Sequence, residues 1–202
     1  MGIREYRNRR STCVDPNLKR SRFTRSSFCS RGLAKHKYQV CPFYWQQRYL
    51  DGDIEAVKQH LANGVDVNVM ADNGGTPLGW NALLGQYEVA ELLIQKGASV
   101  NFKGGDGGTA LHSAAFLGRL EVAKLLIENG ANIGAKNNNF ETPIDVTMAN
   151  WENTQFILGM FNISVDRKET EAGRAKVAEL LNQSDNRNQK QTGDPFHEDQ
   201  PP

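Results

Sequence analysis

The middle of the chain alternates short amphipathic blocks with clusters of turn-forming residues. Leu78 and Ala82 stand four residues apart, which places them on one face of a helix. Gly85 interrupts this pattern, and a second apolar block follows at 89–93. The pattern predicts two short helices separated by a tight turn.

The expected helices carry their own start and stop signals. Thr76 can accept a hydrogen bond as an N-cap, and Pro77 stands at the first helical position, where its missing N–H costs nothing. Gly85 can end the helix in the left-handed conformation. The segments 68–75 and 101–108 are rich in Gly, Asp and Asn, which predicts tight turns on both sides of the helix pair.

The unit recurs with a period of 33 residues. Its opening triplet appears as Thr76-Pro77-Leu78, Thr109-Ala110-Leu111 and Thr142-Pro143-Ile144. Residues 76–108 and 109–141 share 14 identical positions without gaps, whereas ordinary residue frequencies would give roughly two. The chain is therefore built from repeats.

Two stretches of sequence carry a resemblance to a known family. TPLGWNALLGQYEVAELLIQKGASVN and TALHSAAFLGRLEVAKLLIENGANI resemble the ankyrin repeat, whose signature is T-P-L-H-x-A with a 33-residue period. The resemblance implies an all-α solenoid of stacked helix-turn-helix units with short β-turn fingers, and a role in binding proteins. It also implies a structural role for His112, which would brace neighbouring backbone turns.

We divide the chain into three parts. They are a basic arm at 1–41 that we expect to be disordered, an ankyrin repeat domain at 42–183, and a polar tail at 184–202 that we also expect to be disordered. The repeats fall near 42–75, 76–108, 109–141 and 142–183.

The fourth repeat contains extra residues. Val177 lies 55 residues after Val122 instead of 33, so we predict an insertion of 22 residues near 151–172. The insertion carries an apolar cluster at helical spacing, made of Phe156, Ile157, Met160, Phe161 and Ile163. We expect this helix to cap the open end of the stack; a partner-docking helix and a membrane-surface helix are the alternatives.

Charge separates the arm from the rest. Residues 1–40 hold eleven Lys and Arg against two acidic residues, a net charge of +9, and the remainder of the chain is net −8. The arm could be a solvated tail, an upstream stretch added by a misplaced start codon, or a transit peptide. Phe23, Phe28 and Tyr38 lie among its charges, so contact with nucleic acid is a further alternative that we do not favour.

The lack of a recognisable targeting segment and the cysteine content favour a cytoplasmic protein. No apolar run approaches the roughly 18 residues that span a bilayer, and no apolar region after the basic start indicates a secretory signal. The odd cysteine count (Cys13, Cys29 and Cys41) gives no disulfide framework. We expect a monomer.

Candidate chemistry is weak throughout. The segment 104–109 resembles a phosphate-binding loop but lacks the required Lys. The four histidines are scattered, which argues against a metal site, and Asp51 and Asp53 favour helix capping over acid-base chemistry. No Ser or Cys stands in a recognisable nucleophile motif. We therefore predict no catalytic residue, no cofactor and no metal.

The repeat register places a candidate partner-binding surface on the concave side of the stack. The concave candidates are Leu83, Leu84, Phe116, Leu117 and Asn150, with Trp80 expected to be partly exposed one turn earlier, and the finger-tip candidates are Asp72, Asn73, Asp106, Asn138 and Asn139. An apolar stripe with a polar rim is typical of a protein-binding surface. The alternative is that some of the stripe is buried between repeats or under the inserted helix.

The sequence thus predicts a non-catalytic protein-interaction module. A nucleic-acid or membrane-surface tether acting through the basic arm is the second hypothesis.

Overall fold

The computed structural model describes residues 52–71, 73–161 and 163–191, and within them every regular element is a helix. The helices are α2 (Ile54–Ala62), α3 (Pro77–Leu84), α4 (Tyr87–Gln95), α5 (Ala110–Phe116), α6 (Leu120–Glu128), α7 (Pro143–Thr147), α8 (Trp151–Met160) and α9 (Arg167–Gln191). The predicted all-α solenoid is confirmed. The basic arm at 1–41 and Asp72 lie outside the described residues.

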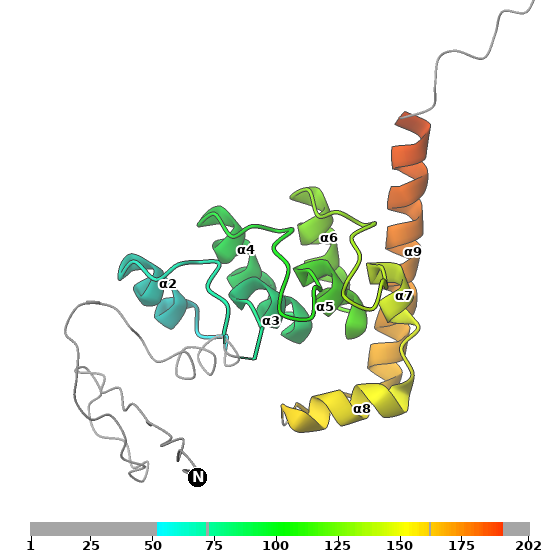
Figure 1. Cartoon of the computed structure of the whole chain (residues 1–202), viewed down its shortest axis with the longest axis horizontal. Helices are drawn as coiled ribbons and strands as arrows, with labels where there is room; N and C mark the ends of the chain where they lie inside the picture. Colours follow the sequence, from blue (N-terminus) through cyan, green and yellow to red (C-terminus); the bar gives the residue numbers. More distant parts are fainter. Residues whose placement is uncertain (1–51, 72, 162, 192–202) are drawn as a thin grey trace, which may run out of the picture.

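The helices stack in two layers (Figure 1). α3, α5 and α7 pack side by side as an inner row, and α2, α4, α6 and α9 follow one another as an outer row. α3 and α4 contact each other, as do α5 and α6 and α7 and α9, so the second, third and fourth repeats each contribute one helix to each row. The two rows meet along a continuous apolar seam.

Each inner helix begins at the threonine of the repeated triplet. The Thr76 hydroxyl oxygen accepts the Gly79 N–H at 3.0 Å. The Thr142 N–H donates to the Asp145 carboxylate at 2.8 Å, and hydrogen bonds from the Thr142 hydroxyl and backbone hold the pKa of Asp145 below its usual value. The start signals read from the sequence therefore form as predicted.

The core lies between the rows and uses the positions that repeat. Leu93, Leu111, Leu126 and Val177 are all fully buried, and small alanines such as Ala82 let the inner helices approach closely. Val177 belongs to α9, so the last helix supplies the outer half of the fourth repeat.

An arginine contact that occurs in two repeats gives the length of the insertion. Arg119 Nε donates to the Leu83 carbonyl at 3.1 Å, across 36 residues, and Arg174 Nε donates to the Phe116 carbonyl at 2.7 Å, across 58 residues. The same contact therefore spans 22 additional residues in the fourth repeat, the length predicted from the sequence. These residues form α8 and the beginning of α9.

The inserted helix does not cap the end of the stack, as we expected from its apolar cluster. α9 covers that end, with Val177 and Leu181 buried against the core. α8 instead runs beneath the inner row (Figure 1), and its cluster is largely exposed, with Phe156 at 72% and Met160 at 62%. α9 also continues to Gln191, so residues 184–191 of the predicted tail are helical.

Candidate protein-binding surface

Three fingers project between the helix pairs, and we define them as residues 71–75, 104–108 and 137–141. Each finger is closed by a backbone hydrogen bond between its first and last residues. The Ala71 N–H donates to the Gly75 carbonyl at 2.9 Å. In the same way, the Gly104 N–H donates to the Gly108 carbonyl at 2.8 Å, and the Asn137 N–H donates to the Glu141 carbonyl at 3.0 Å. The fingers are thus three copies of one turn.

Hydrogen bonds between fingers hold them in register. The Gly105 N–H donates to the Gly74 carbonyl at 2.9 Å, and the Asn138 N–H donates to the Asp106 carbonyl at 3.0 Å. Lys103 Nζ donates to the Lys136 carbonyl at 2.8 Å. A partner would therefore meet a preorganised row of tips, which lowers the entropy cost of binding.

His112 ties the third finger to the inner row. Its Nδ1 accepts the Thr109 N–H at 3.1 Å, so Nε2 carries the proton and donates to the Glu141 carbonyl at 3.1 Å. Burial lowers the pKa of His112, which keeps the imidazole neutral as both contacts require. These contacts fit the bracing role that the family resemblance implied.

The finger-tip candidates are exposed, and the concave candidates are not uniformly so. Asn73, Asp106, Asn138, Asn139 and Asn150 all lie at the surface. Leu83, Leu84 and Phe116 are half-buried.

Two candidates prove to be buried. Leu117, the C-cap of α5, is only 1% exposed, so its assignment to an exposed concave surface is wrong. Trp80 is 8% exposed, against our expectation of partial exposure. Its ring meets Phe161, at the end of α8, edge to face with centroids 4.8 Å apart. The inserted helix therefore takes up part of the face that the register left open.

Arg174 fastens α8 to the stack. Its guanidinium donates to the carbonyls of Phe116 and Ala149 and, at 2.8 Å, to the hydroxyl of Thr154 on α8. It also lies over the Phe116 ring at 5.3 Å, which explains why that ring is only half-exposed. Burial lowers the pKa of Arg174, and the nearby Glu171 carboxylate partly offsets that shift.

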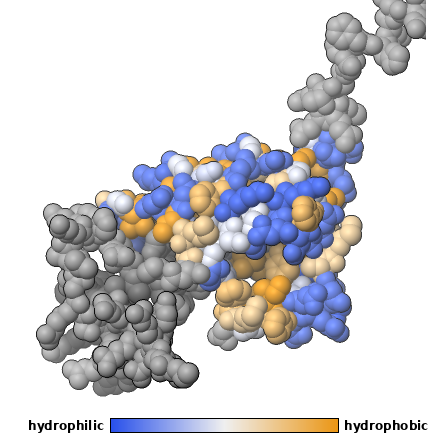
Figure 2. Space-filling view, viewed as in Figure 1, coloured by the Kyte–Doolittle hydropathy of each residue, from blue (hydrophilic) through white to orange (hydrophobic). Residues whose placement is uncertain are grey.

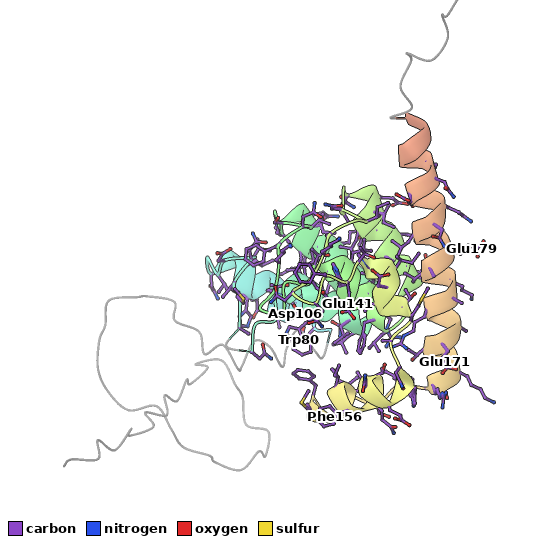
Figure 3. All side chains as sticks on the ribbon, turned by 45° about the vertical axis from the view of Figure 1, so that its right-hand side comes forward. Trp80, Asp106, Glu141, Phe156, Glu171 and Glu179 are labelled. Carbon is purple, nitrogen blue, oxygen red and sulfur yellow. The ribbon has the colours of Figure 1, made fainter. Side chains whose placement is uncertain are left out.

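Apolar side chains remain exposed on α8 itself. Figure 2 shows apolar residues gathered along the lower edge of the molecule, where α8 lies. In Figure 3, Asp106 and Glu141 lie together on the finger side, Trp80 lies below them, and Phe156 lies lower still. A polar row of tips and an apolar helix thus border the inner row on one side of the molecule.

Two features of this surface escaped the sequence analysis, although the repeat carried signals for both. Gly173-Arg174 copies Gly118-Arg119 once the 55-residue spacing is applied, which marks Arg174 as an equivalent of Arg119. Phe140 stands where the period places glycine in the two preceding fingers.

The described part of the chain contains no group of three or more His, Cys, Asp or Glu side chains that could hold a metal ion. None of its helices is long and apolar enough to cross a membrane.

The fold and this surface define a helical repeat solenoid. Residues 48–137 match the family model for ankyrin repeats in three copies. This part of the chain belongs to the ankyrin repeat family. Ankyrin repeats are generally protein-protein interaction modules and typically non-catalytic. A search of curated proteins finds no match to the chain.

Proposed function

We propose that this protein is a non-catalytic adaptor that binds a protein partner through its finger tips and the adjoining open part of the inner row. The observation that carries the proposal is the row of exposed tips, Asn73, Asp106, Asn138 and Asn139, which cross-finger hydrogen bonds hold in fixed register. Asp72, a further candidate, lies outside the described residues.

The apolar part of the surface supports the same proposal. Leu83 and Leu84 keep part of their side chains accessible, and α8 adds Met160 at its free side. An interface needs such apolar area within a polar rim. The half-buried Phe116 lies under Arg174, so a change there would disturb packing as well as binding.

Asn139→Arg tests the proposal. Asn139 is exposed, and its side chain makes only a long contact of 3.5 Å with Glu141, so the substitution leaves the fold intact. Affinity capture from a cell extract by the full chain identifies a partner, and its affinity is then measured with purified protein. We expect the variant to lose about tenfold in affinity, or about 1.4 kcal/mol.

Glu179→Arg is the matched control. Glu179 is exposed on α9 and points away from the stack (Figure 3), and the substitution likewise introduces an exposed arginine. The control should bind as the wild type does. Equal binding by Asn139→Arg and Glu179→Arg would show that the third finger does not contact the partner.

A second candidate function rests on the charge of the arm. Residues 1–40 carry a net charge of +9, which favours contact with phosphate groups of nucleic acid or an anionic membrane surface. Binding to duplex DNA or anionic vesicles at rising salt, with the full chain and with a variant lacking residues 1–40, distinguishes the two functions. Only a tether loses binding when the arm is removed.

A further inference from the structure

The third finger departs from the other two at one residue. A second hydrogen bond closes each turn, from the N–H of Gly74, Gly107 or Phe140 to the carbonyl three residues before it. All three residues have positive φ, at 79°, 72° and 64°. Phe140 thus occupies a conformation that glycine supplies in the first and second fingers.

Glycine is required at the first two positions for two reasons. A residue with a Cβ is strained at such φ values. In addition, an added Cβ at Gly74 would lie 2.8 Å from the Gly105 Cα, and one at Gly107 would lie 2.9 Å from the Asn138 nitrogen. The next finger packs against each glycine and leaves no room for a side chain.

At Phe140 the steric reason no longer applies, but the conformational one does. No finger follows the third one, because the chain continues into α7 and α8, so there is room for a side chain. The backbone strain remains, since a bulky residue with positive φ is a genuine outlier. The ring is nevertheless 79% exposed. Strain of this kind, together with an uncovered aromatic ring, is typical of binding sites.

The edge beside Phe140 has unused hydrogen-bonding capacity. The carbonyls of Gly74 and Asp106 accept N–H groups from the finger that follows them. The equivalent carbonyls on the third finger, those of Asn139 and Phe140, accept no hydrogen bond from the described residues. An extended segment of another chain could therefore continue the row of fingers, as added strands extend a sheet.

We propose that Phe140 and the free edge of the third finger bind an extended, basic peptide segment of the partner protein. Its backbone N–H would donate to the Asn139 or Phe140 carbonyl, and an apolar side chain would pack on the Phe140 ring. Asp106 and Glu141 carry exposed carboxylates on the second and third fingers, which favours Lys or Arg where the segment passes them. This inference rests on the proposed function and names the anchor within it.

A displayed library of random dodecapeptides, selected on the full-length protein, tests the inference. Synthetic copies of the selected peptides are then measured by fluorescence anisotropy against the wild type and three variants: Phe140→Gly, Phe140→Trp and Phe156→Ala. We expect basic peptides with an apolar residue. Their affinity falls at least about tenfold in Phe140→Gly, because an aromatic anchor is lost, and is kept in Phe140→Trp.

Phe156→Ala is the matched control, since Phe156 is also a highly exposed phenylalanine, at 72%, but lies on α8. It should bind as the wild type does. Failure to select any peptide, selection of acidic peptides, or equal binding by Phe140→Gly would each overturn the inference. Peptides that bind Phe140→Gly normally but lose affinity for Asn139→Arg would refute the Phe140 anchor while leaving the proposed function intact.

Discussion

Replacing Arg174 with methionine should detach α8 from the stack. Arg174 is 5% exposed and donates hydrogen bonds to the Phe116 carbonyl, the Ala149 carbonyl and the Thr154 hydroxyl. Methionine approximately keeps the length of the aliphatic stem but supplies no donor, so all three acceptors lose their partner. α8 then keeps two other attachments, Phe161 against Trp80 and the buried side chain of Leu158, which is 3% exposed.

The expected cost follows from these contacts. A hydrogen bond from a charged donor contributes roughly 1.5–3 kcal/mol, but two of the three acceptors are part-buried carbonyls that water can reach in the variant. Removal of the buried guanidinium also releases its desolvation cost. We therefore expect the free energy of unfolding to fall by about 3 kcal/mol.

Arg119→Met is the matched control. Arg119 occupies the same register position one repeat earlier, and among the described residues it donates one hydrogen bond, to the Leu83 carbonyl at 3.1 Å. Its loss should cost about 1 kcal/mol. Urea unfolding of the full chain followed by circular dichroism compares the two variants, and hydrogen exchange reports on α8 directly.

Exchange in residues 151–160 should become faster in Arg174→Met and stay unchanged in Arg119→Met. The reasoning is refuted if Arg174→Met costs no more than Arg119→Met. It is also refuted if α8 exchanges at the wild-type rate, since the arginine would then not be what holds the helix.

Three further predictions concern stability. Gly118→Ala should lower the free energy of unfolding by more than about 2 kcal/mol, because a Cβ would lie 2.8 Å from the Gly173 Cα and φ is 66°. Gly130→Ala has a φ of 82° but no atom within 4 Å of the added Cβ, so it should cost about 1 kcal/mol of backbone strain alone. Similar melting temperatures for the two variants would contradict this. Phe140→Gly should melt at or above the wild-type temperature, since glycine relieves the left-handed strain; a lower Tm would show that the ring packs. Burial holds the pKa of His112 below 6.5, so the unfolded chain binds a proton that the folded chain does not. Stability is therefore fully present above about pH 6.5 and falls as the pH drops toward the folded-state pKa, and thermal melts of His112→Gln should show a weaker loss over that range.

The repeat was predictable because its signals are local. A threonine that caps a helix and a glycine that ends it act within a few residues, and the 33-residue period repeats the evidence. Leu117 shows where this reasoning weakens. The register assigned it to an exposed concave side with Phe116, but Leu117 is 1% exposed, and a repeat register does not say which side chains another segment will cover.

The position of α8 could not be predicted, because its contacts are distant in sequence. Spacing showed that its apolar residues share a helical face, but a periodic pattern does not say which surface that face meets. The decisive partners are Arg174, which lies 20 residues beyond Thr154, and Trp80, which precedes Phe161 by more than two repeats. The expected end cap failed for this reason.

The matching arginine contacts at 119 and 174 show that the fourth repeat stacks normally despite its additional segment. Its outer helix docks on the third repeat as though α7 and α9 were joined by an ordinary turn. In a linear array the stacking of each unit depends mainly on its neighbours, so this junction accepts additional sequence without changing how the units before it stack. The site between Ala149 and Gly173 is accordingly a natural place to graft a binding loop or a reporter domain onto the array.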